Sequence, residues 1–303
     1  MRRAPQHSSG IVSLVVNKPD PKILQDFLSL KFALSRRAAK AMMDGRSVWV
    51  NRRCVWIARF ELKTGDVIEV PSNVVKGAER QSGGRVAEVA PGVGKRHVRV
   101  LWQNESYMVV DKPAGMVSCD DPKSVEMCLR EQEGLPTLEA VHRLDRDTTG
   151  CLLLAKNHVA HLAAVEVFKT HKVSKVYHAI VVGKFPYAHQ VIDAPIDGQN
   201  AVSKVAREGF SADASFLRVR IETGRTNQIR RHLASVRSPI VGDRVFGLKS
   251  ARDPRLMQVC RQMLHASTLT LPDPLDLHAE ISVHSPLPAD FRSTLKLFGM
   301  GKR

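Results

Sequence analysis

The sequence predicts an α+β protein, and three features of the chain indicate this class. From position 98 onward, short strand-like runs and helical patterns mix without a regular strand–helix–strand alternation, which predicts a mixed, largely antiparallel sheet over residues 99–298. Two helical patterns followed by short strands occupy residues 22–71 and predict a small α/β domain. Between them, residues 72–98 have the glycine-rich composition of a linker. The polar, basic residues 1–21 predict a flexible arm.

The N-terminal elements follow from periodicity and capping signals. Apolar residues at helical spacing predict a helix over residues 23–30, and Ser35 can cap a second helix over residues 36–43. Runs of β-branched and aromatic residues predict strands over 48–51 and 67–70. The order LSRRAAKAMMDGRSVWVN…KTGDVIEV resembles an S4 domain, a small RNA-binding module. The resemblance implies an RNA-contacting surface made by Ser35, Arg36, Arg37, Lys40 and Arg46. An ordinary amphipathic helix with a solvated basic face is the alternative.

The larger C-terminal part contains five predicted strands and three predicted helices. The strands cover residues 98–101, 107–110, 152–155, 177–182 and 217–221. The helices cover residues 123–133, 160–170 and 228–236.

Composition restricts the partners and the compartment. Lys and Arg number 46 against 30 Asp and Glu, so the formal charge is +16, which favours a polyanionic partner such as RNA or DNA. The five cysteines are scattered without a CxxC pair, which argues against a structural zinc site and for a reducing compartment. Because the chain has no long apolar run, we expect no membrane span. We therefore expect a cytoplasmic protein, and a monomer by default.

One segment carries the strongest chemical signal. His142–Gly150 reads HRLDRDTTG, and it places Asp145 between Arg143 and Arg146. Nearby cations favour the ionised form of a carboxylate. The segment resembles the HRLDxxTSG signature of the RluA-type pseudouridine synthases. Further motifs appear in the family's order, namely DKPAG at 111–115, SKVYHAIVVG at 174–183, TGRTNQIRRHL at 223–233, PIVGDRVFG at 239–247 and LHA at 264–266.

The resemblance implies a curved sheet of the pseudouridine synthase fold and an RNA-modifying isomerase. Isomerisation of uridine gains and loses no atom, so we expect neither a cofactor nor a metal. A carboxylate can attack or stabilise an electron-poor anomeric carbon, and the resemblance assigns that role to Asp145. It also implies that Arg225 pairs with Asp145 and that Tyr177 stacks on the uracil, with its hydroxyl a candidate for proton transfer at C5.

The resemblance further implies cations that hold the RNA. Arg143 is expected to fill the gap left by a nucleotide that flips out of its stack. Four other cations are expected to contact phosphate around the cleft: Lys112, Lys175, Arg146 and Arg230. His142 is expected to orient the loop by a hydrogen bond, and Asp147 to have a structural role.

Two departures from the family pattern bear on substrate choice. Asn227 stands where relatives carry histidine, and the segment after the KPAG motif includes the acids Asp120 and Asp121. Elsewhere, His158 and His161 stand three residues apart without a third metal ligand in the sequence pattern.

The functional prediction is an RNA pseudouridine synthase acting on large-subunit ribosomal RNA or on transfer RNA. The alternative is a non-catalytic RNA-binding or ribosome assembly factor on a synthase scaffold. A glycosidase or base-excision glycosylase that uses the same acid is a weaker option, and release of free uracil would reveal it.

Overall fold

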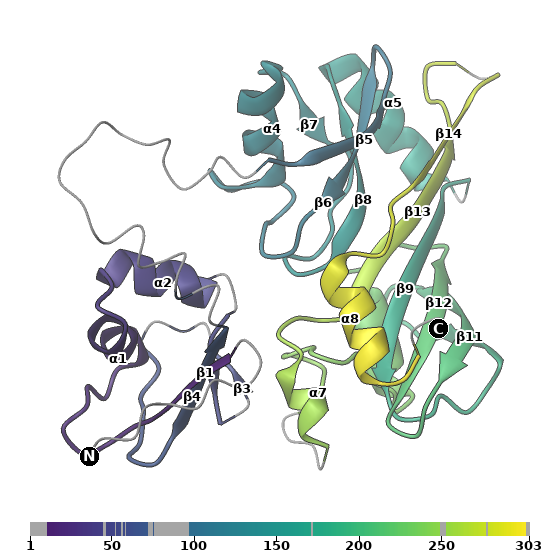
Figure 1. Ribbon diagram of the computed structural model, residues 1–303. Helices are drawn as coiled ribbons and strands as arrows, with labels where there is room; N and C mark the ends of the chain where they lie inside the picture. The colour runs from purple at the N-terminus through teal and green to yellow at the C-terminus, as the bar shows by residue number, and fades with distance from the viewer. Residues whose placement is uncertain are drawn as a thin grey trace. The chain divides into compact units, whose positions relative to one another are not determined.

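The structure is a computed structural model that describes residues 11–44, 47–51, 53–55, 57, 59–71, 75, 97–170, 172–248, 253–276 and 278–300. The chain divides into two compact units (Figure 1). The first consists of Met1–Gly92 and Ser250–Cys260, and the second of Val93–Lys249 and Arg261–Arg303. Most of the predicted linker and the first ten residues of the predicted arm lie outside the described residues.

The first unit contains a four-stranded antiparallel sheet in the order β1-β4-β2-β3. Its elements are β1 (Ile11–Val15), α1 (Leu24–Lys31), α2 (Arg36–Asp44), β2 (Trp49–Val50), β3 (Arg53–Cys54), β4 (Val67–Pro71) and α7 (Pro254–Gln258). The helix α7 comes from a distant part of the sequence. Within this unit, the indole nitrogen of Trp49 donates to the carbonyl of Gln258 over 3.4 Å. The sequence patterns did not predict that residues 253–260 belong to this unit.

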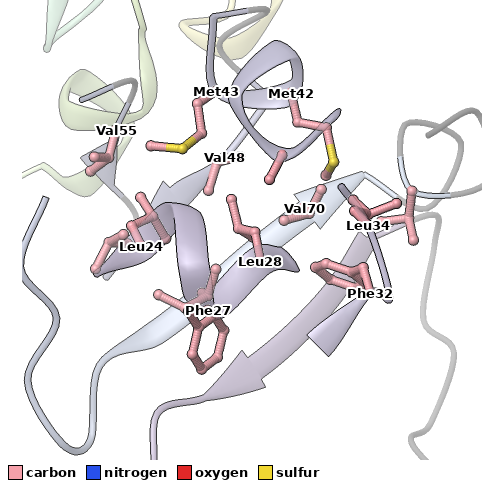
Figure 2. Packing of buried hydrophobic residues seen from close by; sticks show 14 of the residues in the cluster. Leu24, Phe27, Leu28, Phe32, Leu34, Met42, Met43, Val48, Val55 and Val70 are labelled. Carbon is pink, nitrogen blue, oxygen red and sulfur yellow. The ribbon is translucent and has the colours of Figure 1, made fainter. Parts of the chain in front are cut away.

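Apolar residues at helical spacing form the core of the first unit. Leu24, Phe27 and Leu28 lie on one face of α1, because positions three and four residues apart share a face. Figure 2 shows them gathered with Met43 of α2 and Val70 of β4. Burying this apolar stripe between helices and sheet is what stabilises so small a unit.

Strand β1 differs from the expected flexible arm. Ile11–Val15 pairs antiparallel with β4 over its whole length, from Ile11 opposite Pro71 to Val15 opposite Val67. Its side chains alternate between exposed and half-buried positions, which is the pattern of a strand with one face on a core. The run is only five residues long and half of its apolar side chains face solvent. That weak signal explains why the arm was predicted there.

A ten-stranded mixed sheet forms the framework of the second unit (Figure 1). The main order is β10-β11-β12-β9-β13-β8-β6-β5, with β14 beside β13 and β7 beside β8. The strands are β5 (Arg99–Gln103), β6 (Tyr107–Lys112), β7 (Glu139–Ala140), β8 (Thr149–Ala155), β9 (Ser174–Val182), β10 (His189–Asp193), β11 (Val202–Phe210), β12 (Ala214–Ile221), β13 (Leu264–Pro272) and β14 (Glu280–His284). Within the described residues, only β13 and β8 pair in parallel. This confirms the predicted α+β class with a largely antiparallel sheet.

Four helices accompany this sheet: α4 (Val125–Glu133), α5 (His158–Lys169), α6 (Gln228–Ser235) and α8 (Ala289–Leu297). The first three agree closely with the predicted helices, whereas α8 was not predicted. Side-chain caps define two of the starts. The Ser124 hydroxyl accepts a hydrogen bond from the Met127 amide, and the Asn157 side chain accepts one from the Ala160 amide. Within the described residues, no helix has both the length and the apolar composition to cross a lipid bilayer.

The sheet separates α8 from the functional cleft described below. On β12, Phe216 and Val219 are three residues apart, so their side chains point to opposite faces. Phe216 contacts Phe291 of α8 edge-on, with ring centroids 6.2 Å apart. Val219 is directly opposite Tyr177 of β9, and directly opposed residues share a face. Tyr177 therefore points away from α8.

Candidate active site

A cavity of about 1010 Å³ opens on the second unit. It is lined by residues from the 117–120 and 140–146 loops, from α5, from β9 and from the 221–227 turn. A smaller cavity of about 80 Å³ shares several of these residues, including Asp145, Tyr177 and Asn227, and also includes Arg230. The predicted catalytic acid and tyrosine thus lie in one concave site, although 32 residues separate them in the sequence.

The loop that carries Asp145 is anchored through its backbone on both sides of this residue. Ser118 is buried; its hydroxyl accepts a hydrogen bond from the Leu144 amide over 2.9 Å and donates to the Leu144 carbonyl over 3.2 Å. The ammonium group of Lys112 donates to the carbonyl of Arg146 over 2.9 Å. Because these bonds go to the backbone, they hold the loop while leaving the carboxylate of Asp145 available.

Asp145 forms an ion pair with Arg230. The Nη1 atom of Arg230 lies 3.0 Å from the Oδ2 atom of Asp145, and the two side chains are 9% and 30% exposed. The Gln262 amide also approaches Oδ2, at 3.5 Å, and donates to the Thr148 hydroxyl over 2.8 Å. The carboxylate is held from one side and remains open to the cavity on the other.

Arg230 is held in turn by a second carboxylate, that of Asp243. The Nε and Nη2 atoms of Arg230 lie 2.6 and 2.9 Å from the two oxygens of Asp243, whose side chain is fully buried. This two-bond arrangement fixes the plane of the guanidinium group. The ring of Phe246 lies against that plane, 5.1 Å from the guanidinium carbon.

Burial and charge oppose each other at this pair. Burial alone would raise the pKa of Asp243, but hydrogen bonds from Arg230 and from the Phe246 amide outweigh it, so that the net pKa is lowered. For Arg230, burial would lower the pKa, and the two carboxylates raise it instead. Asp243 and Arg230 therefore stay ionised. With the carboxylate of Asp145, the cluster Asp145–Arg230–Asp243 has two acidic groups around one guanidinium.

This geometry corrects the expected partner of Asp145. Arg225 is exposed, and its Nε atom donates to the carbonyl of Asn200 over 3.1 Å. It lines the cavity but does not form the ion pair, which belongs to Arg230 five residues later. Arg225 precedes α6, whereas Arg230 is the third residue of that helix and lies on the face that points toward Asp145. The expectation that Arg230 contacts phosphate is also wrong, because Arg230 is buried and its Nε, Nη1 and Nη2 atoms already donate to the carboxylates of Asp243 and Asp145.

Tyr177 is 8% exposed and lines both cavities. Burial raises the pKa of its phenol, and the negative charge of Asp145 raises it further. Within the part of the chain that the structure describes, its hydroxyl has no hydrogen-bond partner. A protonated, unpaired hydroxyl in a cavity can donate to a ligand.

The predicted RNA-contacting cations fall into two groups. Arg143 and Arg146 are exposed at the large cavity, and the partly buried Lys175 also lines it. The Lys175 ammonium donates to the Thr223 carbonyl over 3.3 Å, and burial lowers its pKa. Lys112, by contrast, is fully buried, and burial lowers its pKa to about 7. Its expected place at the cleft rim is wrong, because it anchors backbone carbonyls instead.

His142 orients the loop, as expected. Its Nε2 atom accepts a hydrogen bond from the Leu153 amide over 3.1 Å, and its ring stacks on Phe168 with centroids 5.0 Å apart. Burial, followed by the charge of Lys175, lowers the pKa of His142 to about 3. The ring is therefore neutral at physiological pH and acts as an acceptor.

The two departures from the family pattern both lie at the cavity. Asn227 adopts a left-handed backbone with φ of 55°, and its side-chain oxygen accepts a hydrogen bond from Arg230. The amide therefore adds a third support to this guanidinium. Asp120 also has a positive φ, of 60°, and accepts a hydrogen bond from the Cys119 thiol. Its carboxylate leaves a negative charge on one wall of the cavity.

Arg261 supports the loop that carries Asp145, and sequence reasoning missed it. It is 3% exposed and forms two bonds, of 2.6 and 3.0 Å, with Asp290 of α8. Its Nη1 atom donates to the carbonyl of Asp147, two residues after Asp145, over 3.1 Å. Sequence reasoning also gave no role to Asp243 or Gln262. Asp243 lies in the PIVGDRVFG motif at 239–247, whereas Arg261 and Gln262 lie outside the motifs.

Four of the five residues predicted to contact RNA on the first unit lie on α2 or directly before it. The Ser35 hydroxyl accepts a hydrogen bond from the Ala38 amide over 3.1 Å, so this residue caps α2. Arg36, Arg37 and Lys40 are exposed on that helix, and Arg36 lies 3.0 Å from Asp26. Arg46 lies outside the described residues.

Two family models match parts of the chain. Residues 106–235 match the family model described as RNA pseudouridylate synthase, and residues 24–68 match the S4 domain. A Pseudomonas aeruginosa protein named ribosomal large subunit pseudouridine synthase D is 30% identical over 287 residues, covering 82% of this chain and 85% of that protein. A Xanthomonas campestris protein of the same name is 32% identical over 269 residues, covering 76% and 80%.

The likeness to solved structures supports the fold. Human RNA Pseudouridylate Synthase Domain Containing 4 superimposes with a TM-score of 0.58 at 23% identity, over 66% of this chain and 93% of that chain. Human RNA Pseudouridylate Synthase Domain Containing 1 gives a TM-score of 0.56 over 63% and 84%.

Proposed function

Since the chain belongs to the family of RNA pseudouridine synthases, isomerases that act on RNA, we propose that its substrate is large-subunit ribosomal RNA and that Asp145 is the nucleophile. Support for the substrate comes from the two relatives, whose name is ribosomal large subunit pseudouridine synthase D. Support for the nucleophile comes from one observation. The Asp145 carboxylate faces a cavity while Arg230 fixes its orientation.

The proposed reaction needs only groups that this chain supplies. The Asp145 carboxylate attacks C1′ of the flipped uridine, and the bond from C1′ to N1 breaks with its electrons leaving on the uracil. The detached uracil turns, and its C5 attacks C1′ and displaces the carboxylate. A proton leaves C5 and N1 gains one, so atoms and charge balance without a co-reactant.

The charge on Asp145 is suited to this role. A carboxylate that formed an ion pair with an arginine bound to no other acid would be neutralised by that arginine. Here Arg230 also pairs with the fully buried Asp243, so the cluster keeps one net negative charge. That charge favours an electron-poor sugar carbon beside Asp145. The fixed guanidinium limits the rotation of Asp145 and so lowers the entropy lost on reaching the reactive geometry.

Tyr177 has a narrower role than general base. Because burial and Asp145 raise the pKa of its phenol, the hydroxyl remains protonated near neutral pH. Its ring can stack on the uracil, and its hydroxyl can donate a hydrogen bond to the detached base. The proton of C5 then passes to water, and N1 takes a proton from water, so the two proton transfers balance.

The RNA must deliver an unstacked nucleotide to the cavity, which costs a few kcal/mol. Arg143 is two residues from Asp145 and exposed at the cavity. A guanidinium can stack on bases and bind phosphate, so Arg143 can occupy the vacated position. Arg146 and Lys175 supply further positive charge beside it.

The decisive experiment compares Asp145→Asn with Asp147→Asn on transcripts of large-subunit ribosomal RNA and of transfer RNA. Asparagine keeps the shape of aspartate without its charge, and both positions lie on the same loop. We expect Asp145→Asn to lower the rate of pseudouridine formation by at least about 10³-fold, with RNA binding retained. Asp147→Asn should keep most activity.

Three results would contradict parts of the proposal. Full activity of Asp145→Asn would remove the nucleophile assignment. Modification of transfer RNA alone would remove the ribosomal substrate. Release of free uracil by the wild-type protein would indicate a glycosylase that uses the same acid.

A further inference from the structure

We infer that Glu139, His158 and His161 form a binding site for a zinc-type divalent transition-metal cation on the second unit. One ligand atom from each residue lies within 4.8 Å of the other two. The histidines lie in the first turns of α5, and Glu139 lies on β7. The histidine pair had no third ligand in the sequence pattern. The strand β7 supplies one, although it is 19 residues before His158.

The two distances from histidine nitrogens to the Glu139 carboxylate are close to the ligand spacing around a tetrahedral ion. The Nδ1 atoms of His158 and His161 lie 3.7 and 3.4 Å from the two oxygens of Glu139. Zinc bonds of about 2.0–2.2 Å in a tetrahedron place neighbouring ligand atoms about 3.4 Å apart. The two imidazole rings are nearly parallel, at 17°, with centroids 6.2 Å apart. The Nδ1 atoms of both rings lie beside the same carboxylate.

An unsatisfied nitrogen provides independent support. The Nδ1 atom of His161 is buried and has no hydrogen-bond partner among the described residues. Its 3.4 Å approach to Glu139 does not have hydrogen-bond geometry. Buried polar atoms normally have partners. A cation between the three side chains would bind the lone pair of this nitrogen.

The ligand set selects the class of metal. Imidazole nitrogens favour zinc, nickel and copper, whereas magnesium and calcium prefer oxygen ligands. The start of α5 carries a partial positive charge that opposes a cation, and the charge of Glu139 offsets it. His158 is 69% exposed and free to adjust toward the other two ligands.

Three protein ligands leave one coordination position open for water. His161 also lines the large cavity, so the bound cation would add positive charge at its wall. It would also tie β7, which precedes the Asp145 loop, to α5. The site is independent of the RNA substrate proposed above.

Calorimetric titration with zinc chloride tests the site on the full chain. The cysteines and the other histidines of the protein are the same in wild type and in the Glu139→Gln variant, so zinc binding to them cancels in that comparison. We expect wild type to bind one more high-affinity zinc ion than Glu139→Gln or His158→Gln. The matched control His189→Gln replaces an exposed histidine on β10 and should bind as wild type does. Loss of one ligand should weaken this site by at least about 10- to 100-fold. Magnesium should not bind there.

Thermal unfolding gives a second measurement. Zinc should raise the Tm of wild type and of His189→Gln above any change seen in Glu139→Gln, because a ligand that binds only the folded state stabilises it. Without zinc, all variants should unfold near the wild-type Tm, which establishes that they fold. Equal zinc stoichiometry in wild type and Glu139→Gln would overturn the inference.

Discussion

Arg230 illustrates how one side chain can serve several partners at the residue scale. Its guanidinium contacts Asp145, Asp243 and the side chain of Asn227. A lysine ammonium has no planar fork and could not bridge two carboxylates in the same way. The next residue, Arg231, points elsewhere and pairs with Asp197 at 2.8 Å, since consecutive helical residues do not share a face.

Conservative substitution distinguishes the roles of Arg230 and Arg225. We expect Arg230→Lys to lower the single-turnover rate of pseudouridine formation by about 100-fold, because the charge remains but the orientation of Asp145 is lost. Arg225→Lys should change the rate less than about threefold, since Arg225 is exposed and bonded to a backbone carbonyl. Rates are measured at saturating enzyme. The reverse pattern would assign the functional arginine to position 225.

His142 gives a prediction about pH. Its pKa is lowered to about 3 in the folded protein, from 6.5, so the unfolded chain binds more protons between these values. Stability is therefore present above pH 6.5 and is lost as the pH falls toward 3. At pH 5 this residue should cost the second unit about 2 kcal/mol relative to pH 7.

The variant His142→Gln isolates this effect, because glutamine can accept the Leu153 hydrogen bond but does not titrate in this range. Urea unfolding at pH 7 and pH 5 should give a smaller loss of stability in His142→Gln than in wild type. An identical pH dependence in both proteins would show that His142 is protonated without penalty.

At the element scale, the junction between β8 and β13 fixes the position of the Asp145 loop. These strands pair in parallel, with Gly150 opposite Ala266. Gly150 follows Thr148 and Thr149, which end the loop that carries Asp145. Gly150 has φ of 110°, and a Cβ there would lie 2.1 Å from the Ala266 carbonyl oxygen. Only glycine allows both the backbone angle and the close approach of the two strands.

Alanine at position 150 should therefore destabilise the second unit by about 3 kcal/mol or more, which corresponds to a fall in Tm of about 6–12 °C. The control is Gly209→Ala on β11, where a Cβ would meet only the Cβ of Phe216, at 3.9 Å. It should lower stability by less than about 1 kcal/mol. Differential scanning calorimetry measures both. Similar Tm values for the two variants would show that the β8–β13 junction can shift to accept a side chain.

At the scale of the whole molecule, the formal charge of +16 is shared between two units that both carry exposed cations. The S4 domain presents Arg36, Arg37 and Lys40 on α2. The second unit presents Arg143 and Arg146 at its cavity. Phosphate contacts add affinity that depends on salt, whereas the reaction depends on the geometry of a few side chains. Affinity and rate should therefore respond to different substitutions.

Replacing Arg36, Arg37 and Lys40 together by glutamine should weaken RNA binding and leave the rate at saturating enzyme within about twofold of wild type. Each lost phosphate contact should reduce the slope of log affinity against log salt by about 0.7–0.9. The control Lys18→Gln with Lys63→Gln removes two exposed charges from other parts of the same unit. An unchanged salt dependence in the triple variant would exclude α2 from the RNA interface.

Local patterns determined the class of fold and most of the helices, and one family motif singled out Asp145 as the candidate acid. Capping residues and helical spacing are properties of a few neighbouring residues, which is why α2, α4, α5 and α6 were predicted closely. The strand β1 was missed because its apolar signal is short and half exposed. The helix α8 and several of the later strands had no strong local pattern, and their burial depends on residues far along the chain.

The family motifs brought Asp145, Tyr177 and the arginine-containing turn to notice, and composition favoured a polyanionic partner. Only the tertiary structure decided that Arg230, not Arg225, meets the acid, that Lys112 is buried, and that Glu139 lies beside two histidines. The physical reason is that ion pairing and burial depend on the direction of each side chain from its helix or strand. That direction follows from packing between residues that are distant in sequence.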